Sequence, residues 1–191
     1  SDLFLRTDHI VMPPQFITFT GIDARTDFKR CREISMRWPV EWGCLIGGKL
    51  GKNRYPDAAV IQDAGKQLRT ALHCCKDFAN YANVGVFPSE TYGHNRLQVN
   101  LLSHVYDLKA LGNIAAQTLT PVIVQVRDAF PKREAGSWLQ YLFDQSGGRG
   151  TCPDAYPEAP DENLVGYAGG LNPLNVADAC SRIKARNYWI D

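Results

Sequence analysis

Eight short runs of apolar and β-branched residues recur along this chain, and most of them are separated by stretches with helical character. The runs cover residues 16–20, 40–46, 70–75, 96–102, 121–126, 140–144, 164–168 and 188–190. Their near-continuous apolar character is typical of strands buried on both faces of a parallel sheet. Parallel strands need long crossover connections, which the helical stretches supply. The sequence therefore predicts an α/β protein.

Helical patterns fill most of the gaps between these runs. The expected helices cover residues 26–38, 57–68, 76–82, 105–117 and 172–186. Thr26 or Asp27 can serve as the N-cap of the first helix, and Pro173 suits the first turn of the last. The segment 130–139 has room for a turn or two only, and the segment 151–163 contains three prolines. The fifth and sixth helices are therefore expected to be shortened or absent.

Two architectures accommodate this order of elements, a (β/α)₈ TIM barrel and an open doubly wound sheet. The count of eight strands favours the barrel, and the first strand is not followed by the G-x-G-x-x-G motif of dinucleotide-binding sheets. We expect one phosphate-binding TIM-barrel domain over residues 1–191. The chain is short for such a barrel, which typically has about 250 residues. Because the eighth strand ends at Asp191, we expect a natural chain that continues into an eighth loop and helix.

Charge and cysteine content limit the kinds of binding partner and the cellular location that can be expected. The chain has 21 Lys+Arg and 20 Asp+Glu, so nucleic-acid and membrane-surface binding are not expected. No apolar run reaches the roughly 18 residues of a membrane helix. The six cysteines form no C-x-x-C pair, which predicts reduced thiols in a cytoplasmic protein with no metal site. No cofactor is expected either, and a homodimer is left open.

Three glycine clusters follow predicted strands. They are Gly47-Gly48, the loop 146–150 and Gly169-Gly170. In a barrel the last loops often hold phosphate, and glycine turns expose N–H groups to an anion. The predicted phosphate-binding residues are Gly147, Gly148, Arg149, Gly150, Gly169 and Gly170. The alternative is that these glycines only form tight turns.

Polar residues at the predicted strand ends form a second group. Asp144 can act as a general acid or base, or it can instead hold the N–H groups of the next loop. His73 can donate a proton, although a lone histidine on a strand is more often a core residue. Asn100 and Gln125 suit the hydroxyl or amide groups of a substrate. Glu41 can pair with a basic group inside the barrel mouth or face solvent.

The glycine loops and their neighbours resemble motifs of phosphoribosylanthranilate isomerase. Asp144 with the GGRG loop, followed by AGGLNPLNV at residues 168–176, is similar to the phosphate-loop signatures of that family, in the same order. Three further pieces match upstream and downstream: NRY at residues 53–55, LQVN at residues 97–100 and Ile190-Asp191. The resemblance is collinear over nearly the whole chain, and AGGLNPLNV is its most specific part.

The resemblance implies a barrel that performs an Amadori rearrangement on a phosphorylated aminoaldose. It makes Asp144 the acid and gives Arg54 and Asp191 roles in substrate binding. Thr20 stands at the place of the family's basic cysteine, and Asn100 at that of a histidine. A threonine hydroxyl is not a base near neutral pH without a strong neighbour. Two hypotheses follow. The first is a divergent isomerase that uses Asp144 and Thr20, with His73 or Asp23 as the second proton group. The second is a non-catalytic barrel that binds a phosphorylated metabolite.

Overall fold

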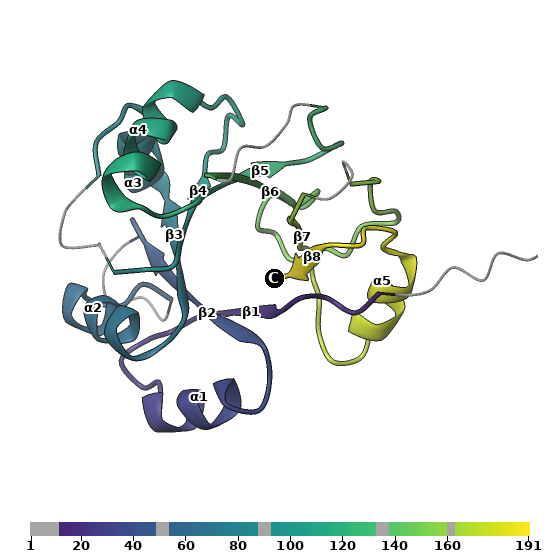
Figure 1. Cartoon of the computed structure of the whole chain (residues 1–191), viewed down its shortest axis with the longest axis horizontal. Coiled ribbons are helices and arrows are strands. Elements are labelled where there is room, and N and C mark those ends of the chain that lie inside the picture. Colours follow the sequence, from purple (N-terminus) through teal and green to yellow (C-terminus); the bar gives the residue numbers. More distant parts are fainter. Residues whose placement is uncertain (1–11, 49–53, 88–92, 133–137, 160–162) are drawn as a thin grey trace, which may run out of the picture.

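The computed structural model describes residues 12–48, 54–87, 93–132, 138–159 and 163–191. Its eight strands are all parallel and close into a barrel in sequence order (Figure 1). The strands are β1 (Ile17–Thr20), β2 (Val40–Ile46), β3 (Thr70–Cys75), β4 (Arg96–Asn100), β5 (Val122–Val126), β6 (Leu139–Phe143), β7 (Val165–Tyr167) and β8 (Tyr188–Ile190). The predicted (β/α)₈ architecture is thereby confirmed.

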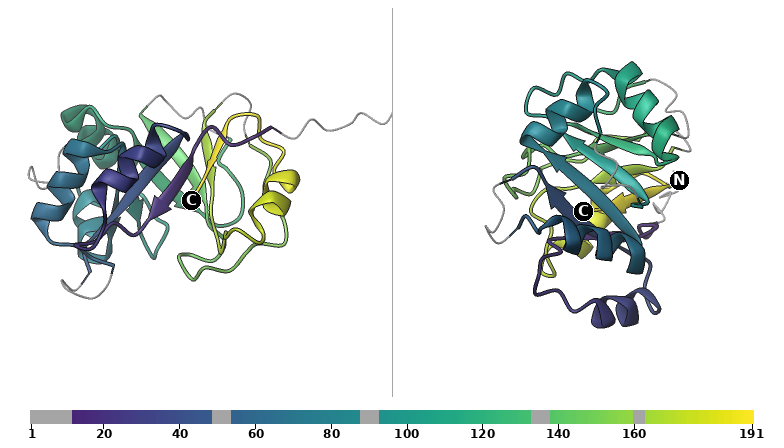
Figure 2. Two further views of the ribbon diagram at one scale, coloured as in Figure 1. Left: turned by 90° about the horizontal axis from the view of Figure 1, so that it is seen from below. Right: turned by 90° about the vertical axis from the view of Figure 1, so that its left-hand side faces the viewer.

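Five helices lie outside the barrel: α1 (Phe28–Ser35), α2 (Ala58–Gln67), α3 (Lys76–Asn83), α4 (Leu108–Thr118) and α5 (Val176–Arg182). The side chains of Asp27, Asp57 and Asp107 cap the N-termini of α1, α2 and α4 by accepting backbone N–H bonds. Helices α1–α4 gather on one side of the barrel and α5 lies on the other (Figure 2). The described residues between β5 and β6, and between β6 and β7, form no helix, as expected from the sequence.

The last helix begins later than predicted. The structure starts α5 at Val176, whereas the sequence pattern placed its start at residue 172. The Asn172 and Asn175 amides both donate to the Gly170 carbonyl, at 3.2 and 2.9 Å. Asn175 also accepts the Asn172 N–H at 2.8 Å. These side-chain bonds build a turn over residues 170–175, and such turns compete with helix formation.

The hydrophobic core has two parts, one on each face of the strands. The larger part fills the space between the strands and the helices, and includes Leu72, Leu111 and Val124. The smaller part lies inside the barrel and consists of Phe16, Ile123, Leu142, Ala168 and Trp189. Side chains alternate between these two parts along β5, β6 and β8, which contribute Ile123, Leu142 and Trp189 to the inner part.

A seam between the first and last strands closes the barrel. Ile17 and Ile190 are the registered partners that join β1 to β8. Two further backbone bonds cross this seam, from Gln15 N to Tyr188 O at 2.7 Å and from Ile190 N to Phe16 O at 3.4 Å. Residues more than 170 positions apart in the sequence therefore meet at the seam.

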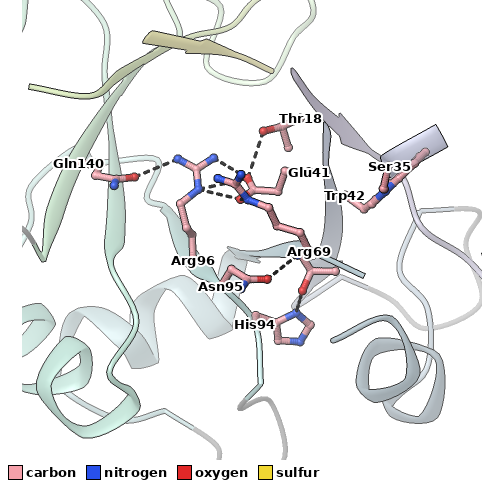
Figure 3. A network of polar contacts seen from close by, with 10 residues as sticks. Thr18, Ser35, Glu41, Trp42, Arg69, His94, Asn95, Arg96 and Gln140 are labelled. Carbon is pink, nitrogen blue, oxygen red and sulfur yellow. Dashed lines mark hydrogen bonds and ion pairs between the residues drawn. The ribbon is translucent and has the colours of Figure 1, made fainter. Parts of the chain in front are cut away.

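A buried ion pair occupies the amino-terminal end of the barrel interior (Figure 3). Arg96 donates to both carboxylate oxygens of Glu41, with Nε–Oε2 at 3.0 Å, and to Gln140 Oε1 at 2.9 Å. Thr18 also donates to Glu41, and Arg69 lies 3.6 Å away. Glu41 thus pairs with basic groups inside the barrel, but at the end opposite to the strand C-termini.

Aromatic rings complete the surroundings of this pair. The Arg96 guanidinium carbon lies 4.1 Å from the centroid of the Trp189 ring and 4.7 Å from that of Phe16. The Arg69 guanidinium lies 4.2 Å from the same Phe16 ring. Cation–π attraction is strongest at such desolvated sites, so the rings help offset the burial of charge.

The cysteines are all free thiols. Cys31, Cys44 and Cys74 are buried core residues, and Cys75, Cys152 and Cys180 are half-buried. Half of the cysteines therefore act as small apolar core residues. In the part of the chain that the structure describes, no helix has the length and apolar content needed to span a membrane.

Stability is expected to fall below pH 6.5 because of His94. Burial lowers the pKa of His94 from 6.5 to about 4 in the folded protein. As the pH falls, the unfolded chain therefore binds a proton at this histidine before the folded protein does. Each such group removes up to about 1.4 kcal/mol of stability per pH unit as the pH falls from 6.5 to 4. Urea unfolding across this range should show a shallower loss for His94→Gln than for the wild type. Parallel curves for the two proteins would contradict this assignment.

Candidate active site

A cavity of about 380 Å³ opens at the carboxyl ends of the strands, and we call it the mouth cavity. It brings together nearly all of the predicted site residues: Thr20, Arg54, His73, Asn100, Gln125, Asp144, Gly147, Gly148, Gly150, Gly169, Gly170 and Asp191. Arg149 is not among the lining residues, and Asn53 lies outside the described residues. Gly47 and Gly48 line a different cavity, beside α2 and α3.

Asp144 organises the glycine loop that follows β6. Its Oδ1 accepts the Ser146 hydroxyl at 2.7 Å, and its Oδ2 accepts the Gly148 N–H at 2.7 Å. Ser146 Oγ in turn accepts the Gly150 N–H at 3.2 Å. Asp144 is therefore the loop-holding residue that the sequence allowed as an alternative. The same side chain is 5% exposed and lines the mouth cavity, where it can also meet a ligand.

The two late glycine clusters pack directly against each other. A Cβ atom on Gly169 would lie 2.7 Å from Thr151 O, and one on Gly170 would lie 2.4 Å from Gly150 O. Both residues also have positive φ, at +117° and +60°. These positions therefore require glycine for close backbone approach. The N–H groups of Gly169 and Gly170 donate to no other described residue.

Two details of the phosphate prediction differ from the structure. The Gly169-Gly170 turn does not lead directly into a helix, because α5 starts only at Val176. Arg149 turns its Nε back to the Ser146 carbonyl, at 2.9 Å, and so helps to close its own loop. An anion at this turn would therefore depend on loop N–H groups and nearby cations, and not on a helix N-terminus.

Thr20 and Asp191 form a pair across the barrel seam. The Thr20 hydroxyl donates to Asp191 Oδ1 at 2.9 Å. Thr20 is therefore a hydrogen-bond donor to a carboxylate. Its position on β1 orients Asp191 in the mouth cavity.

His73 lies deeper in the barrel than the other titratable residues of the mouth. It is 3% exposed, and its Nε2 atom has no hydrogen-bond partner among the described residues. Burial lowers the pKa of His73 below 6.5, while the charges of Asp191 and Glu41 act in the opposite direction. The imidazole is consequently neutral near pH 7 and can donate or accept at a ligand.

The third and fourth strands contribute residues that the sequence reasoning missed. Gln98 donates to Asn100 Oδ1 at 3.1 Å, and Asn100 donates to Cys75 Sγ at 3.5 Å. Burial raises the pKa of the Cys75 thiol. The period-two alternation from His73 to Cys75, and from Asn100 to Gln98, is the signal that could have found them.

Lys76 lines the site but was not predicted to do so, whereas Asp23 was considered from the sequence but lies outside the site. Lys76 lines the mouth cavity with φ of +50°, and its ammonium lies 5.9 Å from the Tyr55 ring centroid. Asp23, considered as a second proton group, pairs with Arg25 at 2.8 Å and does not line the mouth cavity. Lys76 and Arg54 thus supply positive charge at the mouth, and Asp144 and Asp191 supply negative charge.

Comparison with solved structures places this fold among known barrels. The chain is similar to the N-(5'-phosphoribosyl)anthranilate isomerase of Pyrococcus furiosus, with a TM-score of 0.57 and 13% identity over 92% of this chain and 87% of that one. It is also similar to the putative copper homeostasis protein CutC of Streptococcus agalactiae, with a TM-score of 0.54 and 12% identity over 94% and 98%. At these identities the likeness shows a shared TIM-barrel fold. No family model and no curated protein matches the chain.

Within the described ranges, no three His, Cys, Asp or Glu side chains lie close enough together to hold a metal ion. Some polar groups of the mouth cavity pair with one another, as in Thr20–Asp191 and Asp144–Ser146.

Proposed function

We propose that the chain is an acid/base isomerase that acts on a small phosphorylated sugar or aminoaldose bound in the mouth cavity. The observation that carries this proposal is the position of His73, a buried and neutral imidazole that lines one cavity with the carboxylates Asp144 and Asp191. Proton-transfer catalysis requires a group that can donate a proton and a group that can accept one, both facing the same cavity. The free thiols fit the cytoplasmic location that we propose for it.

The phosphate end of the ligand would lie at the glycine loops. The free N–H groups of Gly169 and Gly170 lie on the rim of the same cavity as the cations Arg54 and Lys76. Backbone N–H groups and fixed cations are the usual partners of phosphate. The likeness to an isomerase whose printed name contains a phosphoribosyl group supports the same choice. A cavity of about 380 Å³ suits a ligand of this size.

The sugar end would lie among the strand-end residues. Isomerisation of an aldose to a ketose breaks the C2–H bond, forms a C1–H bond and moves the hydroxyl proton of O2 to the carbonyl oxygen O1, without net oxidation. One group must therefore carry the proton between the two carbons, and a second group must assist the proton transfer between the two oxygens. Asp144, which accepts two hydrogen bonds as a carboxylate, would remove and return the proton. The neutral His73 would donate a hydrogen bond to the carbonyl or imine, and Asn100 and Gln125 would bind hydroxyl groups.

A second candidate is a non-catalytic barrel that binds the same class of ligand. Both carboxylate oxygens of Asp144 are engaged by its own loop, and the hydroxyl of Thr20 is engaged by Asp191. These bonds favour a preformed binding site even if no proton is transferred. The two candidates differ only in turnover, and both require binding of a sugar phosphate.

Ligand binding is tested by thermal unfolding with ribose 5-phosphate, glucose 6-phosphate and inorganic phosphate. A ligand at about 100 times its Kd should stabilise the fold by about 2.7 kcal/mol, which raises the Tm by about 5–10 °C. Gly170→Ala should abolish the shift, because its Cβ would collide with Gly150 O. Gly85→Ala is the matched control, since Gly85 also has positive φ but has only Ala110 Cβ nearby, at 3.8 Å.

Turnover is tested by NMR in D₂O. An isomerase should exchange the C2 hydrogen of a bound aldose phosphate for deuterium, and a binding protein should not. Stabilisation without exchange for any ligand of the panel would favour the second candidate. Lack of any thermal shift at high ligand concentration would overturn both.

A further inference from the structure

Arg127 packs against the glycine loop that follows β6. A Cβ atom on Gly147 would lie 2.6 Å from Arg127 Nη2, 3.2 Å from its Cζ and 3.4 Å from its Nε. The guanidinium therefore occupies the space that any larger residue at position 147 would need. Gly147 lines the mouth cavity, whereas Arg127 is not among the lining residues. Gly147 thus contacts both the guanidinium and the mouth cavity.

The pairing of β5 with β6 holds Arg127 in this place. Arg127 is the first residue after β5, and Asp144 is the first residue after β6. Val126 and Phe143, the last residues of the two strands, are registered partners. The Asp144 N–H donates to Val126 O at 3.0 Å, and the Gly147 N–H donates to Asp144 O at 3.1 Å. Backbone hydrogen bonds therefore join the position of Arg127 to that of the loop.

The charge of Arg127 has no partner in the described part of the chain. Its Nε atom is buried without a hydrogen-bond partner, and the side chain as a whole is half-buried. Arg127 forms no ion pair with a described carboxylate, although the exposed Asp128 is the next residue. An arginine stays protonated at all accessible pH values. Because partial burial reduces screening by solvent, this charge acts on the loop that it contacts.

The loop itself has little left to offer an anion. Three of its N–H groups, those of Gly147, Gly148 and Gly150, already donate to acceptors between residues 144 and 146. One of these acceptors is the carboxylate of Asp144, whose negative charge opposes the binding of an anion beside it. A phosphate group at this loop therefore needs a positive charge close by.

The other cations of the site are less well placed to supply this charge. Arg54 lies in the connection after β2, and Lys76 begins α3 directly after β3. In a closed barrel of eight strands in sequence order, β2 and β3 stand opposite β6 and β7, which carry the glycine loops. Arg149 belongs to the loop but is exposed, so solvent screens its charge. Of these four cations, Arg127 is the half-buried one that contacts the loop.

We propose that Arg127 is a positioning residue for the phosphate group of the ligand and acts through Gly147. Its charge would offset that of Asp144 at the loop, and its guanidinium would support the backbone of Gly147 from behind. This inference rests on the proposed function, because it assumes a phosphorylated ligand in the mouth cavity. It adds the requirement that affinity depends on the charge of residue 127, a side chain that does not touch the ligand.

NMR titration of the full chain with ribose 5-phosphate and with uncharged ribose tests this inference. Arg127→Met should weaken the binding of ribose 5-phosphate about tenfold, and Arg127→Lys, which keeps the charge, should stay within about threefold of the wild type. Ribose should bind to all three proteins with the same affinity. Arg30→Met is the matched control, because it removes one positive charge from the exposed face of α1 and should leave both affinities unchanged.

The outcomes separate this inference from the proposed function. If no phosphate compound of the thermal-unfolding panel binds to the wild type, both fail. If ribose 5-phosphate binds equally to the wild type and to Arg127→Met, the inference alone is overturned. It is also overturned if Arg127→Met and Arg127→Lys lose the same affinity, or if Arg127→Met loses ribose to the same extent, since Arg127 then acts only by packing.

A measurement on the wild type keeps the inference testable if Arg127→Met does not fold. The buried Nε–H of Arg127 should give a ¹⁵N signal, which is assigned from its absence in Arg127→Lys. Ribose 5-phosphate should shift this signal and ribose should not, because only the phosphate group interacts with the charge. Equal shifts with the two ligands, or no shift with either, would overturn the inference.

Discussion

Replacing Arg96 with leucine is expected to lower the free energy of unfolding by about 3–5 kcal/mol, because it leaves the charge of Glu41 buried without its main partner. Glu41 is fully buried and Arg96 is 4% exposed. Arg69, which is partly exposed and 3.6 Å away, cannot replace the bidentate contact. The change is measured by urea unfolding monitored by circular dichroism. The Trp189 and Phe16 rings would also lose the cation that they contact.

Arg30→Leu is the control for this prediction. Arg30 pairs with Glu33 at 3.0 Å on the exposed face of α1, where such pairs contribute about 0–1 kcal/mol. Replacing Glu41 and Arg96 together, by methionine and leucine, should recover most of the stability that the single change loses, since no charge is then left unpaired. Similar losses for Arg96→Leu and Arg30→Leu would show that the buried pair is not important for stability.

The second large effect is expected at Asp144. With Asp144→Asn, the rate of deuterium exchange into a saturating sugar phosphate should fall about 10²–10⁴-fold, the usual contribution of a general acid or base. Binding should weaken less, because asparagine can still accept one of the two loop hydrogen bonds. NMR measures the exchange rate, and thermal unfolding with ligand measures the binding.

Ser146→Ala separates a catalytic role of Asp144 from its role in the loop. This variant removes the Ser146 hydroxyl, and with it the hydrogen bonds to Asp144 and from the Gly150 N–H, but keeps the carboxylate. If Asp144 transfers a proton, Ser146→Ala should slow exchange by less than tenfold at saturating ligand. Equal losses of exchange in Ser146→Ala and Asp144→Asn would mean that Asp144 acts only by shaping the glycine loop.

Much of this fold could be predicted because its signals are local. Strand β2 begins and ends where its apolar run does, and the same holds for β3 and β8. The scarcity of helical pattern after residues 126 and 144 correctly predicted that no helix follows β5 or β6 in the described segments. The start of α5 was missed because two asparagine side chains compete there with the helical backbone.

Most residues that line the candidate site could be predicted from the sequence, but the hydrogen bonds between them could not. Strand ends converge in any barrel, so Thr20, His73 and Asp191 could be grouped from the sequence. The bond between Thr20 and Asp191 joins residues 171 positions apart, and that between Arg96 and Glu41 joins residues 55 apart. Such pairs depend on register and closure, which composition and periodicity do not determine.

For a ligand bound in the mouth cavity, the seam between β1 and β8 would link affinity to the integrity of the whole barrel. Thr20 and Asp191 stand on its two sides, so the carboxylate is oriented only while the first and last strands remain joined. With Ile17 and Ile190 as its registered pair, the seam is the shortest strand junction in the sheet. Local opening costs least where few contacts must break. A ligand that bridges Thr20 and Asp191 would therefore hold β1 and β8 together, and its binding energy would suppress opening of the barrel.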